Sequence, residues 1–100
     1  MTASLEKVVC RTPTPGKKPT RINAAKFALL RRAILAVIPR RREGVRFRDL
    51  PRLAASRLSS EQRRGLGSVN WYVTTVKLEL EVPGAIRRLP GVTPQRLVRA

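Results

Sequence analysis

The apolar residues of positions 69–82 recur at helical spacing and gather on one side of a helical wheel. This side holds Val69, Tyr72, Val73, Val76 and Leu80. Such a pattern predicts a helix that buries one face against a core. Ser68 can cap the helix, and Pro83 and Gly84 end it. We therefore expect the helix to run from about Val69 to Val82.

The rest of this helix is divided between a second apolar arc and a polar stripe. The arc consists of Trp71, Leu78 and Val82, and the stripe consists of Asn70, Thr74, Lys77 and Glu81. The polar stripe lies between the two apolar arcs, so the helix exposes little of its surface to water. A helix with apolar residues on two sides offers a partner only a narrow polar surface.

A second strong helical pattern covers residues 22–38. Its apolar face consists of Phe27, Leu30, Ile34 and Ile38. Asn23 is the expected cap, with Ile22 and Phe27 placed as a hydrophobic staple across it. Pro39 ends the helix.

Shorter elements fill the interval between these two helices. Val45 and Phe47 belong to a short extended piece that needs a partner strand, and the strong candidates lie after Gly84. Asp49 is the expected cap of a second helix that reaches Ser59. The connection that follows is about ten residues long, and we expect a single turn in it at Ser60.

The two ends of the chain are both basic. Residues 5–10 predict a strand, and the proline-rich segment 11–21 predicts a surface arm. This arm either lies along phosphates or tethers the strand, and the sequence leaves both roles open. Residues 85–89 and 95–100 predict two short strands around a proline and glycine turn.

Charge limits the class of partner. The 100 residues contain 22 Lys and Arg against 6 Asp and Glu, a formal net charge of +16. Such a field attracts nucleic acid or anionic lipid. The most apolar segment, residues 25–39, carries Arg31 and Arg32 in its middle and is too short to span a bilayer. We therefore expect a polyanionic partner and no membrane.

Reactive side chains are scarce. There is no histidine, and Cys10 is the single cysteine, so neither a disulfide framework nor a zinc site is expected. The sequence also offers no paired carboxylates for acid and base work and no phosphate-binding glycine loop. We expect no enzyme, no cofactor, no small-molecule substrate and a reducing, cytoplasmic location.

The order of elements resembles that of a winged helix-turn-helix domain. Leu80, Glu81, Gly84 and Ile86 match the L-E-x-x-G-x-I ending by which the third helix of many bacterial winged-helix proteins enters the wing. Residues 22–38 and 71–81 are also similar to a family of small bacterial proteins of unassigned function. The resemblance implies an α+β fold with three helices, a short strand and a C-terminal two-stranded wing. Residues 1–22 would form an N-terminal strand and basic arm, and residues 23–100 the winged helix-like domain.

The predicted function is weakly specific nucleic-acid binding, with DNA favoured over RNA. Lys77 is the single cation of the third helix and is outweighed by Glu79 and Glu81, so we expect the arginine-rich wing and turn to contact phosphates. The candidate binding residues are Arg40, Arg41, Arg42, Asn70, Thr74, Lys77, Arg87, Arg88 and Arg96.

A protein-interaction or homodimer module without a nucleic-acid target is the alternative. In that case Trp71, Leu78 and Val82 would contact another subunit. For Trp71 itself we favour a place in the core beneath residues 5–10, because aromatic side chains are most often buried.

Overall fold

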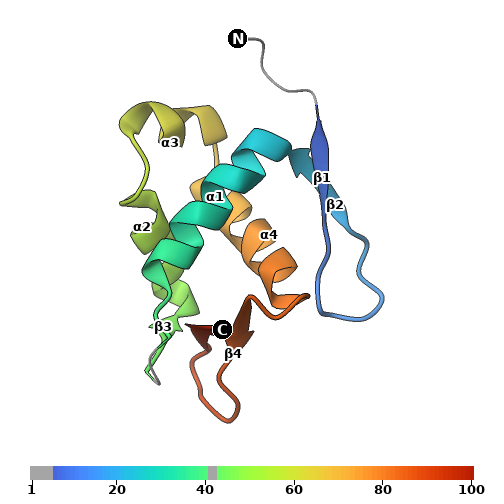
Figure 1. Ribbon diagram of the computed structural model, residues 1–100, viewed down its shortest axis with the longest axis vertical. Coiled ribbons are helices and arrows are strands. Elements are labelled where there is room, and N and C mark those ends of the chain that lie inside the picture. Colours follow the sequence, from blue (N-terminus) through green and yellow to red (C-terminus); the bar gives the residue numbers. More distant parts are fainter. Residues whose placement is uncertain (1–5, 41–42) are drawn as a thin grey trace.

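The computed structural model describes residues 6–40 and 43–100, and within them the chain has an α+β fold (Figure 1). This part contains four α-helices, one 3₁₀ helix and two small sheets. The helices are α1 (Ala24–Val37), η1 (Phe47–Asp49), α2 (Leu50–Ala55), α3 (Ser60–Leu66) and α4 (Val69–Glu81). None of the helices in these residues is long and apolar enough to cross a membrane.

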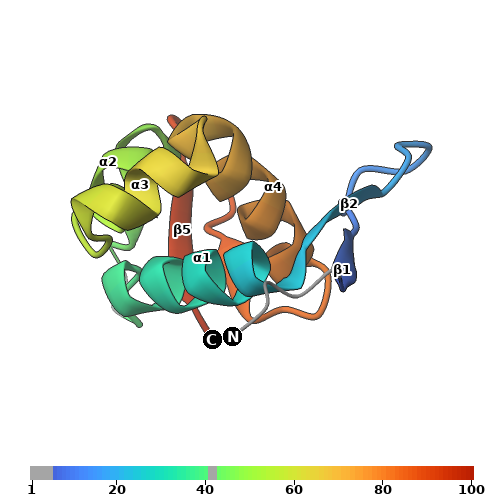
Figure 2. The ribbon, with the colours of Figure 1, turned by 90° about the horizontal axis from the view of Figure 1, so that it is seen from above.

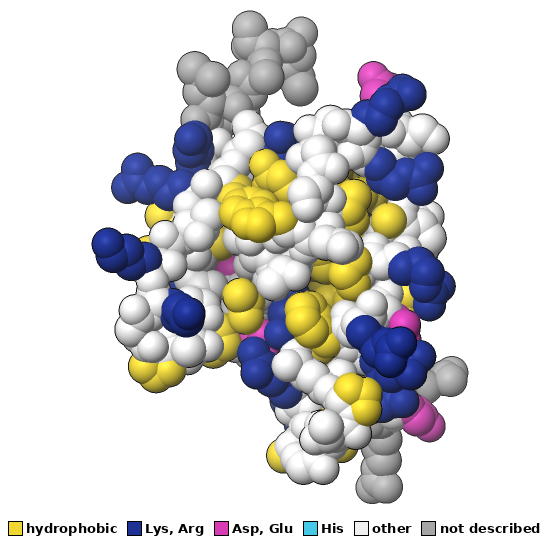
Figure 3. Space-filling view, turned by 180° about the vertical axis from the view of Figure 1, so that it is seen from behind, with side chains coloured by type: hydrophobic (Ala, Val, Ile, Leu, Met, Phe, Trp, Pro, Cys, Tyr) yellow, Lys and Arg dark blue, Asp and Glu magenta, His cyan; other side chains and the backbone are white. Residues whose placement is uncertain are grey.

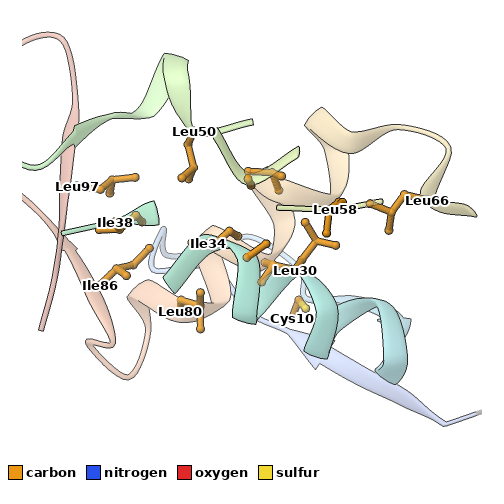
Figure 4. Packing of buried hydrophobic residues seen from close by; sticks show 14 of the residues in the cluster. Cys10, Leu30, Ile34, Ile38, Leu50, Leu58, Leu66, Leu80, Ile86 and Leu97 are labelled. Atoms are coloured by element: carbon orange, nitrogen blue, oxygen red, sulfur yellow. The ribbon is translucent and has the colours of Figure 1, made fainter. Parts of the chain in front are cut away.

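The core lies where α1, α2 and α4 meet, and the two predicted apolar faces contribute six of its fifteen buried residues in the described part of the chain. Leu30 and Ile34 of α1 are buried in one cluster with Val73, Val76 and Leu80 of α4, and Figure 4 shows Leu30, Ile34 and Leu80 within it. Both predicted faces are therefore confirmed. The cap of α1 is confirmed as well, since the side chain of Asn23 accepts a hydrogen bond from the backbone N–H of Lys26 at 3.1 Å.

The N-terminal strand is half of a hairpin. β1 (Lys7–Cys10) pairs with β2 (Thr20–Asn23) in antiparallel register, with Val8 opposite Ile22. The sequence predicted that Ile22 begins a helix, but it lies in β2, one residue before the helix cap. The boundary expected after residue 22 thus falls inside a strand. Figure 2 shows the loop of this hairpin projecting away from the helices.

The second sheet joins the short strand to the C-terminal hairpin. Its strands are β3 (Val45–Arg46), β4 (Ile86–Arg88) and β5 (Arg96–Arg99), in the order β3-β5-β4. Val45 pairs with Leu97, which confirms the prediction that this piece finds its partner after Gly84. Gly44 has a φ of +59°, and a Cβ there would collide with the carbonyl oxygen of Leu97, so glycine is required for the approach of β3 to β5.

The connection before α4 differs from the prediction, because it contains a helix of 7 residues where a single turn was expected. The side chain of Ser59 accepts from the backbone N–H of Gln62 at 3.0 Å, and the Gln62 side chain accepts from the backbone N–H of Ser59 at 2.8 Å. This is a capping box, whose Ser-x-x-Gln spacing is present in the sequence. Leu66 buries the end of the helix in the core.

The second predicted helix is shorter than expected. It begins as η1 and continues as α2, which ends at Ala55 and not at Ser59. Asp49 does not cap α2 with its side chain, because its carboxylate accepts from Nε of Arg46 at 2.9 Å. After the helix, the hydroxyl of Ser56 donates to the carbonyl of Leu53 at 2.6 Å, and Ser59 already starts the next helix.

Candidate nucleic-acid interface

The acidic residues of α4 are held by basic residues from two other elements. Glu79 receives three hydrogen bonds from Arg11, which follows β1. The backbone N–H and Nε of Arg11 donate to Oε1 at 2.8 and 3.0 Å, and Nη2 donates to Oε2 at 2.8 Å. The hydrogen bonds from the Arg11 guanidinium lower the pKa of Glu79. Both carboxylate oxygens are thus occupied, and the N-terminal hairpin is tied to α4.

Glu81 lies between two cations, one on its own helix and one in the second sheet. Its Oε2 is 2.8 Å from Nζ of Lys77, and its Oε1 accepts from Nε of Arg88 at 2.6 Å. The Glu81 side chain is only 6% exposed. This carboxylate therefore joins α4 to β4 and presents almost no negative charge to solvent.

Lys77 belongs to the predicted polar stripe and to the predicted binding residues, but it is buried with 1% of its surface exposed. It follows Val73 by four residues and precedes Leu80 by three, so it borders the core face of the helix. Its ammonium lies 4.4 Å from the ring centroid of Phe47. Burial lowers the pKa of Lys77, and the nearby Glu81 opposes that shift. Lys77 is not accessible to a phosphate.

The outer face of α4 is consequently neutral. Asn70 and Trp71 are exposed, and Thr74, Thr75 and Leu78 are partly exposed. Figure 3 shows the side of the molecule opposite to that of Figure 1, with hydrophobic and neutral side chains in the middle and lysines and arginines on both sides.

Trp71 contradicts the expectation that it is part of the core. Its side chain is 47% exposed and meets the ring of Tyr72 edge-on, with ring centroids 4.9 Å apart. The reason is its position on the helix wheel. The core arc through Val73 and Val76 is closed by α1, whereas Trp71 lies on the second arc, on which Leu78, farther along the helix, lines a groove beside the N-terminal hairpin.

The predicted binding arginines of the second sheet differ in the interactions that their side chains make within the protein. Arg87 is exposed, and no hydrogen bond or ion pair of its side chain is found within residues 6–40 and 43–100. Arg88 is bound to Glu81. Nη1 of Arg96 donates to the carbonyl oxygen of Glu43 at 3.0 Å. Three arginines predicted in one element therefore have unequal access to a ligand.

The basic turn lies at the other edge of that sheet. Arg40 is exposed, and its Nε donates to the carbonyl oxygen of Ala100 at 3.0 Å. Arg41 and Arg42 lie outside the residues that the structure describes. The strand order places β4 next to α4 and β3 at the far edge, so Arg87 and Arg40 are on opposite edges of the sheet.

The loop of the N-terminal hairpin, by contrast, lies beside Arg87 and Arg88. Pro13, Thr14 and Pro15 line one groove together with these two arginines. The sequence weighed the basic arm as a phosphate contact but could not place it beside the wing, because Arg11 and Glu79 are 68 positions apart. Lys17 and Lys18 are absent from the predicted set for that reason.

The acidic side chains and the single cysteine are the groups of this chain that could ligate a metal ion. Within residues 6–40 and 43–100, no group of three or more Cys, Asp or Glu side chains could hold a metal ion. Burial, with a smaller contribution from Glu79, raises the pKa of Cys10 to about 11. A thiol with that pKa is almost entirely protonated at neutral pH and is a poor nucleophile.

These features define a small, basic α+β domain in which cations of the protein neutralise Glu79 and Glu81 of α4. The chain belongs to a family of unknown function, DUF6958, whose model matches residues 7–97. This agrees with the resemblance to small proteins of unassigned function. Comparison with curated proteins gave no match, and comparison with solved structures gave none either.

Proposed function

We propose that the chain is a winged-helix domain that binds nucleic acid, DNA in preference to RNA, with weak sequence specificity. The order of elements from α1 to β5 supports the winged-helix assignment, if α3 is counted as part of the connection before α4. The sheet supports it too, because the strand after the first helix pairs with the last strand, and β4 occupies the outer edge. In this assignment α4 is the third helix, and β4 and β5 form the wing.

The main support for this function is that the acidic residues of α4 are neutralised within the protein. Both acids of the C-terminal half of α4 are bound by cations of the protein itself, Glu79 by Arg11 and Glu81 by Lys77 and Arg88. From the sequence, Glu79 and Glu81 would repel a phosphate backbone. Their neutralisation removes that repulsion and leaves a neutral helix face next to cations, which suits a nucleic acid that must approach closely.

The roles of the individual residues follow from their access to solvent. Arg87 contacts a phosphate, because its guanidinium has no partner within the described part of the chain. Asn70 and Thr74 on the neutral face reach base edges and neutralise no phosphate. Arg88 and Arg96 mainly hold the wing in place, although each guanidinium keeps further N–H groups that can reach a phosphate.

The test is a titration of fluorescently labelled random-sequence duplex DNA and single-stranded RNA, followed by anisotropy at several salt concentrations. The affinity for DNA should decrease steeply as the salt concentration rises. Arg87→Ala should reduce the slope of log K against log [salt] by about 0.9 for one lost contact with B-DNA. Arg31→Ala removes the same charge from an exposed position on α1 and serves as the matched control. Absence of binding by the wild-type chain at low salt would refute the proposal.

A protein-interaction module remains the second candidate because Trp71 is 47% exposed. Tryptophan is enriched in protein interfaces, and Leu78 and Val82 continue its arc along the helix. Sedimentation of the wild-type chain and of Trp71→Ala would detect a homodimer that depends on this side chain.

A further inference from the structure

A groove of about 300 Å³ separates the loop of the N-terminal hairpin from α4. The loop side carries Arg11, Lys17 and Lys18, and the helix side carries Thr75 and Leu78. Segments from opposite halves of the sequence thus meet in one concave, basic surface.

The positive charge of this groove is available to a ligand. Lys17 and Lys18 are exposed, and neither has an acidic partner within residues 6–40 and 43–100. Glu79 is the acid that reaches this side of α4, and both of its oxygens are bound by Arg11. An anion in the groove would therefore meet cations without competing against a free carboxylate.

The groove also supplies neutral hydrogen-bond donors. The hydroxyls of Thr14, Thr20 and Thr75 line it or its rim, and no hydrogen bond to the protein engages them within the described residues. Lysine ammonium groups and threonine hydroxyls are common partners of phosphate oxygens. Leu78 gives the groove an apolar wall, which suits the sugar of a nucleotide better than a free inorganic ion.

The groove continues toward the wing. Thr14 lines this groove and also lines the groove that contains Arg87 and Arg88. A single backbone can therefore pass from Arg87 across the loop to Lys17. We propose that the hairpin loop and α4 form a second phosphate-binding site, which holds the backbone of the nucleic acid that Arg87 contacts. This inference rests on the proposed function and adds a second set of phosphate contacts, along α4, to the contact made by Arg87.

Lysine removal tests the charge of the site. The double variant Lys17→Ala/Lys18→Ala is compared with Arg31→Ala/Arg32→Ala, which removes two charges from exposed positions of α1. Two lost phosphate contacts should reduce the salt slope by about 1.8 for B-DNA, so the affinity ratio between 50 and 200 mM salt should fall by about tenfold. The control pair should change the slope much less. If the two double variants had equal slopes while Arg87→Ala still weakened binding, the groove would not be a phosphate-binding site. The proposed function would be unaffected by that result.

Removal of a hydroxyl tests the position of the site. Thr75→Val keeps the shape of the side chain and removes no charge, so affinity should drop severalfold while the salt slope stays the same. Trp71, the single tryptophan, lies one helical turn before Thr75, and its fluorescence should change when the groove is filled. Unchanged affinity of Thr75→Val and unchanged Trp71 emission on saturation with DNA would place the backbone elsewhere.

A comparison with inorganic phosphate tests whether the groove binds a nucleic-acid backbone or free phosphate. At constant ionic strength, a short oligonucleotide should change Trp71 emission at a concentration at least about a hundredfold lower than inorganic phosphate, because one phosphate makes only a fraction of the contacts. If inorganic phosphate saturates the signal as tightly as the oligonucleotide, the groove is a site for free phosphate, and its assignment to a nucleic-acid backbone is wrong.

Discussion

Two hairpins flank α4, and they use their cations in opposite ways. In the C-terminal hairpin, Arg88 binds Glu81, and Arg96 and Arg99 donate to backbone carbonyl oxygens. In the N-terminal hairpin, the Arg11 side chain binds Glu79 of α4, and Lys17 and Lys18 in the loop stay without partners in the described part of the chain. The hairpin with more arginines therefore has fewer cations available to a ligand.

Some cations of this domain stabilise the fold, and others are free to bind an anionic ligand. A count of residues treats every arginine alike, but a guanidinium that donates to a carboxylate contributes little to the outward field. Among the residues predicted to bind, Arg87 keeps its charge free and Lys77 is buried. Substitutions at these contacts test the difference between the hairpins, and the expected effects differ in size.

The largest effect is expected at Glu81. Replacing it by alanine leaves the buried ammonium of Lys77 without its carboxylate and should reduce the free energy of unfolding by about 3–5 kcal/mol. Chemical denaturation measures the loss. The double variant Lys77→Met/Glu81→Leu removes both charges and should recover most of the stability, although it also loses the contact with Arg88. A double variant as unstable as the single one would mean that the ion pair is not the cause.

The contact that ties down the N-terminal hairpin should be sensitive to acid. Arg11 lowers the pKa of Glu79, so this carboxylate stabilises the fold above the pKa of an unfolded glutamate, about 4.3, and the stabilisation disappears as the pH falls through the lower folded pKa. Glu79→Gln should be less stable than wild type at pH 7, and the difference should vanish in acid. Thermal melts from pH 7 to pH 2.5 measure both curves. A difference that does not depend on pH would contradict the role of this charge.

A smaller effect is expected at Cys10, beside the same contact. Its thiol is 3% exposed and has a pKa of about 11, so alkylation by iodoacetamide at pH 8 should be slow. Arg11→Ala releases the hairpin and should increase the rate of alkylation severalfold. Mass spectrometry over time follows the reaction. Arg21→Ala, an exposed change on β2, is the control and should leave the rate unchanged.

The elements that the sequence predicted correctly are those decided by local patterns. Asn23, Ser68 and the apolar faces of the two long helices specify their own helices through caps and spacing. The pairing of Val45 with Leu97 was also predictable, because a short strand requires a partner. The helix of residues 60–66 could have been found from its Ser-x-x-Gln capping box.

The candidate site was harder to predict because long-range contacts decide it. Whether Glu79 repels a phosphate depends on Arg11, which is 68 positions away, and the wheel position of Lys77 does not reveal that Phe47 covers it. Trp71 was misplaced because the sequence does not show how far the hairpin extends along α4. The predicted set of binding residues therefore contains arginines of the wing but none of the cations of the hairpin loop, where we propose a second site.

If free cations bind nucleic acid, Arg87→Ala and Arg88→Ala should differ, because Arg88 is bound to Glu81 whereas Arg87 has no partner in the described part of the chain. Both variants lose one charge from the same strand. Duplex binding across a salt series and thermal melts would be measured for each. Arg87→Ala should reduce the slope of log K against log [salt] by about 0.9 and leave the melting curve unchanged, whereas Arg88→Ala should reduce the slope less and lower stability by up to about 1 kcal/mol. A steeper loss of salt dependence in Arg88→Ala than in Arg87→Ala would contradict the claim.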